Sequence, residues 1–138
     1  SALARLESLQ RDGEQSVADL YELGSVQLRK RLYGQATETL KRAAKRAGDE
    51  PAEARALIEN ALGFSLAAQS NYSAAIRHYR SALQAKADYP VALNNLAYAL
   101  EKQQKGEEAR ATYQKVLELD STNRTAQKRL KRLDKLAA

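Results

Sequence analysis

Apolar residues recur along this chain with the period of α-helices, and short polar or glycine-containing breaks separate the helical stretches. The C-terminal stretch shows the pattern most simply, because Ala126, Leu130, Leu133 and Leu136 are four, three and three residues apart. Side chains at this spacing share one face of a helix. The pattern predicts helices over residues 14–31, 33–47, 51–69, 72–86, 90–104, 106–119 and 123–136, and a short leading helix over residues 1–12 that carries Leu3, Leu6 and Leu9.

The apolar pattern also repeats itself at a fixed offset. Three pairs are 34 residues apart, namely Leu62 and Leu96, Ala75 and Ala109, and Tyr79 and Tyr113. Leu23 precedes Leu62 by 39 residues, which is the same period with five inserted residues. We place the insertion within 51–55, next to Pro51, and expect it to lengthen the start of the following helix. The repeat units are therefore 17–50, 56–89 and 90–123.

This repeat resembles the tetratricopeptide motif, which has small residues at positions 8 and 20 and a large one at position 24. Those positions hold Gly24, Gly63 and Ala97, then Ala36, Ala75 and Ala109, then Leu40, Tyr79 and Tyr113. Small side chains let two helices approach closely, and the large one fills the space beside them. The resemblance implies an all-α, right-handed solenoid of three helix-turn-helix repeats. Its domain covers 14–138, residues 123–136 form a capping helix, and 1–13 form a leading segment.

Two positions depart from the motif. The middle repeat has Glu59 at position 4, where the family has a large apolar residue, and the first repeat has Gln27 at position 11, where an aromatic residue or leucine is usual. We expect both to weaken the packing locally without changing the fold.

Composition agrees with a helical, non-catalytic protein. The chain is 43% hydrophobic and 29% charged, and its commonest residues are good helix formers. It has no cysteine, which excludes disulfides and thiolate metal sites. The single histidine, His78, has no second ligand at metal-binding spacing, so we expect a surface residue. No phosphate-binding, dinucleotide, nucleophile-elbow or zinc-protease motif occurs, so we predict neither an enzyme nor a cofactor or metal.

The net charge of +6 is concentrated at the C-terminus. Residues 121–138 hold six basic residues and one acid. Three interpretations stay open: a solvated outer face on the capping helix, an anionic membrane surface, or nucleic acid. The first is favoured, and nucleic acid is disfavoured because no aromatic residue is interleaved for base stacking.

In tetratricopeptide folds the first helix of each repeat lines a concave groove, and the resemblance implies the same here. Three aromatic residues on this face, with two asparagines, favour the binding of a partner peptide, because aromatic rings give contact area and asparagine can bond a peptide backbone. The predicted groove residues are Tyr21, Ser25, Leu28, Arg29, Asn60, Phe64, Asn94, Tyr98, Lys102 and Lys128.

Two alternatives bear on this groove. Phe64 could instead fill the space left by Glu59, which would give it a structural role. The subclass that clamps the C-terminal carboxylate of chaperones has lysine and asparagine where this chain has Tyr21 and Ser25. We therefore do not expect a chaperone-tail clamp.

Three stretches, 22–33, 60–64 and 88–96, resemble a narrower group, the cyanobacterial and chloroplast tetratricopeptide proteins that assist photosystem I assembly. That resemblance implies an assembly scaffold at the thylakoid membrane, facing the cytoplasm or stroma and held by an anchor upstream of Ser1. The chain has no methionine, which agrees with a longer parent protein. The expected partner is a photosystem I subunit or another assembly factor. The main alternative is an adaptor of another bacterial multiprotein complex, and a nucleic-acid or lipid adaptor is third.

Overall fold

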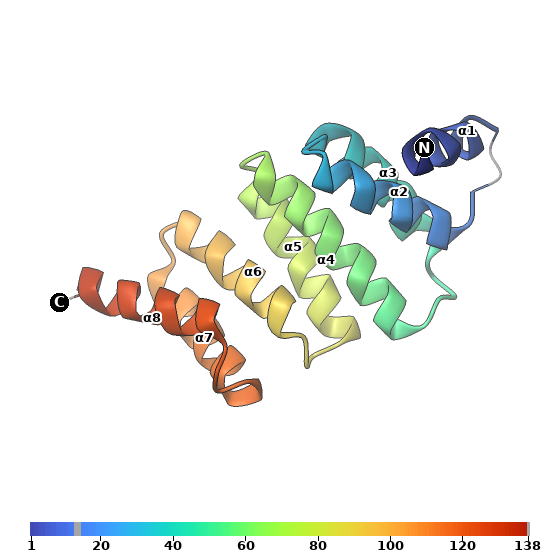
Figure 1. Cartoon of the computed structure of the whole chain (residues 1–138). Coiled ribbons are helices and arrows are strands. Elements are labelled where there is room, and N and C mark those ends of the chain that lie inside the picture. The colour runs from blue at the N-terminus through green and yellow to red at the C-terminus, as the bar shows by residue number, and fades with distance from the viewer. Residues whose placement is uncertain (13–14, 138) are drawn as a thin grey trace.

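A computed structural model describes residues 1–12 and 15–137, and within them it contains eight helices and no strand (Figure 1). Every predicted helix is present close to its predicted bounds, and the all-α solenoid is confirmed. The division into a leading segment and a repeat domain stays a prediction. The helices are α1 (Ala2–Asp12), α2 (Val17–Arg29), α3 (Tyr33–Arg46), α4 (Ala52–Ala68), α5 (Tyr72–Ala85), α6 (Pro90–Lys102), α7 (Gly106–Leu119) and α8 (Arg124–Ala137).

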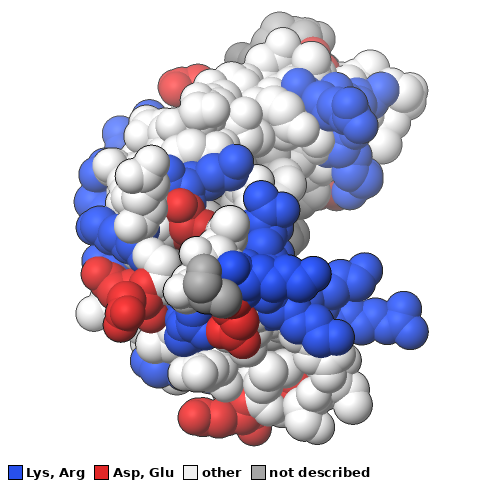
Figure 2. Space-filling view, turned by 90° about the vertical axis from the view of Figure 1, so that its left-hand side faces the viewer, with Lys and Arg blue, Asp and Glu red and all other residues white. Residues whose placement is uncertain are grey.

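The helices form antiparallel pairs that stack in chain order. α2 packs on α3, α4 on α5 and α6 on α7, while α1 and α8 cover the two ends of the stack (Figure 1). The first helices of the pairs are also neighbours, because α2 contacts α4 and α4 contacts α6. They run in the same direction, since one antiparallel helix separates each from the next. Seen from the α8 end, the molecule is C-shaped around a hollow (Figure 2).

Glycine at position 8 brings the two helices of a pair into contact. A Cβ atom on Gly24 would lie 2.6 Å from Leu40 Cδ2, and one on Gly63 would lie 2.6 Å from Tyr79 Cε1. Leu40 and Tyr79 are fully buried at these contacts. The predicted pairing of a small residue at position 8 with a large one at position 24 is therefore confirmed.

The inserted residues lengthen the first helix of the middle repeat, as predicted. α4 has 17 residues, whereas α2 and α6 have 13 each. Pro51 directly precedes α4 with φ −56°, a value that the proline ring imposes and that suits entry into a helix. The middle repeat thus extends one additional helical turn beyond its neighbours at the N-terminal end of α4.

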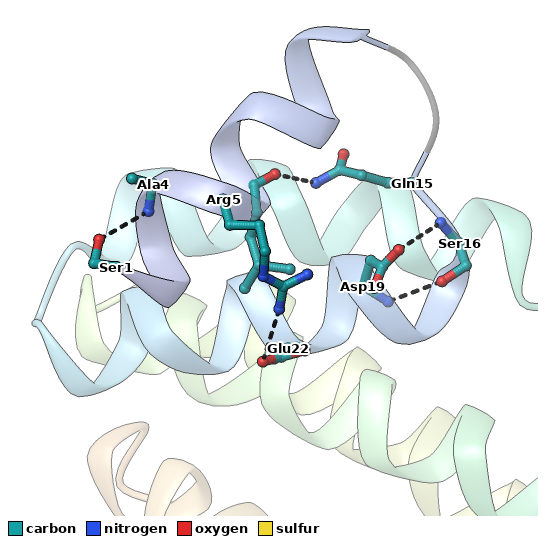
Figure 3. Close-up of polar contacts among 8 residues, drawn as sticks. Ser1, Ala4, Arg5, Gln15, Ser16, Asp19 and Glu22 are labelled. Atoms are coloured by element: carbon teal, nitrogen blue, oxygen red, sulfur yellow. Dashed lines mark hydrogen bonds and ion pairs between the residues drawn. The ribbon is translucent and has the colours of Figure 1, made fainter.

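Local signals define several helix ends. Ser16 and Asp19 form a reciprocal capping box at the start of α2 (Figure 3). Pro90 occupies the first turn of α6, where its missing N–H costs nothing. The Asn123 side chain accepts a hydrogen bond from Ala126 N (3.0 Å) at the start of α8. Asn123 therefore caps the start of α8.

The N-terminal helix α1 lies against α2. Leu6 is fully buried, and its carbonyl accepts a hydrogen bond from Gln15 Nε2 at 2.8 Å (Figure 3). Arg5 also reaches Glu22 on α2, at 3.9 Å. The predicted leading helix is thus present and covers the first repeat.

The joint between the first and middle repeats is polar. Thr37 Oγ1 on α3 donates to Ser65 Oγ on α4 (2.8 Å) and accepts from Gln69 Nε2 (2.9 Å). Thr37 and Ser65 are both buried. At the equivalent joint between the middle and last repeats, the corresponding residues are Ile76 and Ala99, which belong to the main hydrophobic core. At this pair of buried positions, one joint of the solenoid is therefore hydrogen-bonded and the other apolar.

The C-terminal stripe of α8 differs from the prediction at its last residue. Ala126 and Leu133 are buried and Leu130 packs partly against the core, but Leu136 is 72% exposed. The predicted apolar stripe of α8 is therefore buried only in part, because its last residue stays exposed.

Candidate protein-binding groove

Four large apolar side chains are exposed on the first helices of the middle and last repeats. Leu57 and Phe64 lie seven residues apart on α4, and Val91 and Tyr98 lie seven apart on α6. Phe64 is 45% exposed and Tyr98 41%. The two pairs occupy the same repeat positions, 2 and 9, because 34 residues separate them. Adjacent parallel helices therefore present these apolar side chains at matching positions, and we call the face that carries them the groove.

The helix geometry explains why these residues face outward. Side chains seven residues apart lie on the same face of a helix, two turns from each other. Between them, Leu62 and Gly63 on α4 point into the core, where Gly63 meets Tyr79. Positions 2 and 9 lie about a third of the way around the helix from that contact, on its exposed side. Exposed apolar residues grouped in this way mark interaction sites more often than scattered ones do.

The predicted residues of the first repeat are less exposed. Tyr21 and Leu28 are half-buried and pack against the main core, Ser25 is half-buried, and Arg29 is exposed. Arg29 stands at position 13, at the C-terminal end of α2. The first repeat thus adds an exposed cation to the groove but little apolar surface.

The asparagines at position 5 face the last residue of their own repeat. Asn94 Nδ2 donates to Asn123 Oδ1 (3.1 Å), and Asn60 lies at the same offset from Tyr89. Burial raises the pKa of the Tyr89 hydroxyl and nearby Tyr21 raises it further, while a hydrogen bond with Asn60 lowers it. Tyr89 thus belongs to the groove, although sequence reasoning missed it. The sequence feature that could have indicated this is the position of Tyr89 directly before Pro90, at the start of α6.

Hydrogen bonds within the chain already occupy some of the polar atoms of these asparagine side chains. Asn60 Oδ1 accepts from Asn95 Nδ2 at 3.0 Å, which joins α4 to α6. Asn94 Oδ1 is buried and has no hydrogen-bond partner among the described residues. Of the two amides proposed to bond a partner backbone, neither presents an exposed, unpaired oxygen, because Asn60 Oδ1 is bonded and Asn94 Oδ1 is buried.

At the C-terminal end of the groove, two cations flank Tyr98. Lys102 Nζ lies 5.3 Å and Arg129 Cζ 5.2 Å from the centre of its ring. Arg129 is held by Glu101 through two hydrogen bonds, of 2.6 and 3.0 Å. Glu101 also accepts from the Tyr113 hydroxyl at 2.6 Å. Hydrogen bonding to Glu101 raises the pKa of Arg129 despite its partial burial, so this guanidinium stays charged.

Sequence reasoning assigned Lys102 and Lys128 to the groove but not Arg129. The structure places Lys102 against Tyr98, while Lys128 is exposed on α8 and borders a hollow beside Leu117 and Leu130. Arg129 was counted only as one residue of the basic C-terminus. Its contact with Tyr98 depends on how α8 sits on α6, which the repeat pattern does not specify.

The Glu59 site differs from both expectations placed on it. His78 Nδ1 lies 2.7 Å from Glu59 Oε2, and both side chains are about three-quarters buried, with 27% and 24% exposed. Glu59 is therefore paired, and the interpretation that Phe64 fills the space beside it is wrong. His78 was expected at the surface, but its pairing with Glu59 holds it between α4 and α5.

Gln27, the other departure from the motif, is also buried. It is 3% exposed, and its Oε1 has no partner among the described residues. It borders an open hollow of about 770 Å³ together with residues of α1 and α3. The expected local weakness in packing is present at this end of the solenoid.

Within residues 1–12 and 15–137, no three histidine or acidic side chains are grouped as they would be around a metal ion. None of the helices in the same ranges combines the length and the apolar character that a membrane span requires. The arrangement offers a binding surface made of aromatic, aliphatic and cationic side chains.

A family model of the tetratricopeptide repeat matches residues 66–133. The chain is 33% identical over 118 residues to the ycf37 protein of Cyanophora paradoxa, a match that covers 86% of this chain and 68% of that protein. It is 32% identical over 120 residues to the chloroplastic protein PYG7 of Arabidopsis thaliana. That match covers 86% of this chain but only 39% of the Arabidopsis protein.

Solved structures with this fold include peptide-bound ones. The first repeat domain of Spaghetti (RPAP3), bound to an HSP90 peptide, superposes with a TM-score of 0.81 at 21% identity, over 88% of this chain and 94% of that one. The Arabidopsis OM64 domain superposes with a TM-score of 0.80 at 21% identity, over 86% of this chain and 94% of that one. At such identities the likeness concerns the fold alone.

Proposed function

This chain belongs to the tetratricopeptide-repeat family, and on that premise we propose that it is a non-catalytic assembly scaffold for photosystem I. The groove holds a segment of a photosystem I subunit or of another assembly factor. The observation that carries the proposal is the row of exposed apolar side chains at positions 2 and 9 of two adjacent repeats: Leu57, Phe64, Val91 and Tyr98.

Exposing those side chains to water is unfavourable. When a partner covers large apolar side chains on adjacent helices, the burial stabilises the complex by about 25 cal/mol per Å² of apolar area. Phe64 and Tyr98 also resemble the aromatic anchors that dominate measured binding energies. Because the groove forms on rigid, packed helices, little ordering is needed before binding.

The photosystem I role rests on the resemblance of stretches 22–33, 60–64 and 88–96 to proteins of that assembly pathway. The relationship to PYG7, a chloroplastic protein by its name, supports a location in photosynthetic membranes. We place the domain at the thylakoid surface on the cytoplasmic or stromal side, with membrane attachment through a segment upstream of Ser1. An adaptor in another multiprotein complex is the competing proposal, and partner identity separates the two.

The test is affinity capture from photosynthetic membrane extract, read by mass spectrometry. The baits are the native domain, the Phe64→Ala/Tyr98→Ala variant and a control, Leu119→Ala. Leu119 is 46% exposed on α7, outside the groove, so its truncation removes a large exposed apolar side chain without touching the groove. Recovery of photosystem I subunits or assembly factors should fall about tenfold or more with the groove variant and stay unchanged with the control.

Two outcomes would count against the proposal. Equal recovery on all three baits would show that the groove is not the binding surface. Groove-dependent recovery of proteins unrelated to photosystem I would favour the competing adaptor role. Thermal unfolding of each bait confirms that loss of binding does not come from loss of folding.

A further inference from the structure

The groove has two unlike edges. At the N-terminal end of its helices, position 2 carries Leu57 and Val91, both exposed. At the C-terminal end, position 13 carries Arg29 and Lys102, also exposed. Since α2, α4 and α6 run in the same direction, the apolar residues lie along one edge and the cations along the other. Phe64 lies between the two edges.

Few carboxylates neutralise the cationic edge. Lys102 and Arg129 flank Tyr98, and Arg132 follows Arg129 by three residues on the same side of α8. Glu101 supplies one negative charge, and Arg129 and Tyr113 already use it. Among the described residues, neither Lys102 nor Arg132 forms an ion pair.

The surface view shows the same asymmetry on the whole molecule. Figure 2 looks from the α8 end, and Lys and Arg side chains gather on both arms of the C, at the opening of the hollow. Acidic side chains are scarce there and lie mainly on the outer surface in this view. A ligand that enters the hollow therefore passes between positive charges, which attract acidic partners and repel basic ones.

Resting on the proposed function, we infer that the groove takes an acidic, amphipathic segment of a partner protein. The segment lies across α2, α4 and α6. Its apolar residues contact Leu57, Phe64, Val91 and Tyr98, and its carboxylates lie along Arg29, Lys102 and Arg129. Three neighbouring helices with axes about 8–10 Å apart span about 20 Å, and a helical segment of about 14 residues covers that length.

The carboxylates meet a site that is already ordered. Glu101 fixes Arg129 through two of its donor nitrogens, and the third, Nη1, is left for a ligand. The recognition differs from a chaperone-tail clamp, because it uses position 13 and the capping helix in place of Tyr21 and Ser25.

The experiment uses two synthetic helical peptides of about 14 residues. Both carry leucine along one face, and the other face carries glutamate in one peptide and glutamine in the second. Binding to the domain is followed by fluorescence anisotropy at low and moderate salt. The variants are Lys102→Gln, Phe64→Ala and the matched charge control Lys115→Gln. Lys115 is exposed on α7 and forms no ion pair within the part of the chain that the structure describes.

We expect the glutamate peptide to bind about tenfold more tightly than the glutamine peptide, with a preference that shrinks as salt rises. Lys102→Gln should weaken only the glutamate peptide, by roughly threefold to fivefold, as expected for one partly exposed ion pair. Phe64→Ala should weaken both peptides, and Lys115→Gln neither.

Equal affinity for the two peptides, or equal effects of Lys102→Gln and Lys115→Gln, would overturn the inference. Failure of both peptides to bind would overturn it as well. If the glutamate preference is absent while the Phe64→Ala/Tyr98→Ala variant still loses partner capture, the proposed function stands and only the acidic specificity fails. A third arm uses vesicles containing phosphatidylglycerol: if Lys102→Gln releases the domain from vesicles without any glutamate preference, the cationic edge serves a membrane instead.

Discussion

Replacing Gly63 with alanine adds one methyl group where α4 and α5 touch, and two effects oppose each other. Alanine is the better helix former by about 1 kcal/mol. The new Cβ, however, would lie 2.6 Å from Tyr79 Cε1, 2.7 Å from Tyr79 Cδ1 and 3.2 Å from the Ala75 carbonyl oxygen. Favourable carbon–carbon contacts lie at about 3.5–4.0 Å, so the helices must separate or the ring must move.

Neither adjustment is easy in the middle repeat. Tyr79 is 1% exposed, and α5 packs on α4 on one side and on α6 on the other. Overpacking in a core typically costs about 1–3 kcal/mol. Because the close atoms belong to a rigid ring and to backbone, we take the upper half of that range. After the gain in helix propensity, we expect Gly63→Ala to lower the free energy of unfolding by about 1–2 kcal/mol.

Urea denaturation followed by circular dichroism measures this difference. The control is Gly106→Ala at the first residue of α7, where an added Cβ would meet no atom within 4 Å. The control should be as stable as the native chain or slightly more stable. If Gly63→Ala matched the control, close approach at position 8 would not be what requires glycine there, and the packing argument would fail.

Three further predictions follow from the polar and aromatic contacts. Thr37→Val and Ser65→Ala should each lower the free energy of unfolding by about 1 kcal/mol, and the double variant should lower it by little more than either alone. If a double-mutant cycle measured in urea gave simple additivity, it would contradict the shared hydrogen bond. Burial raises the pKa of Tyr79 and Tyr113 above the ordinary tyrosine value, so both keep their protons in the fold after the unfolded chain has lost them. Stability should be full below about pH 10 and fall above it, as a urea midpoint titration would show. Glu101→Gln should weaken the docking of α8 by about 1.5–3 kcal/mol, visible as faster amide hydrogen exchange in α8 alone.

The fold was predictable because small and large residues recur at a fixed spacing. Gly24 and Gly63, at position 8, let the second helix of the pair approach closely. Leu40 and Tyr79, at position 24, fill the space beside them. That packing depends on side-chain size, which the sequence states directly. The exposed pair Phe64 and Tyr98 could be placed by the same argument, since positions facing away from this contact are left for solvent.

Contacts that occur once were harder to predict. The pairing of His78 with Glu59 joins two helices of one repeat, but Glu59 was considered only as a departure from the motif and His78 only as a candidate metal ligand. Considered together, a carboxylate and an imidazole on facing helices would have indicated the pair. The contact of Arg129 with Glu101 had no such signal, because it depends on the reach of a long side chain across the last joint of the solenoid.

The polar joint between the first two repeats has a consequence for rearranged versions of this chain. If the middle repeat were deleted, Thr37 would face Ala99 and lose its hydroxyl partner Ser65. If it were duplicated, Ile76 of one copy would face Ser65 of the next, where the native chain has Thr37. The repeats share a backbone plan, yet each joint admits only its own neighbour, so the order of the units is itself encoded in their side chains.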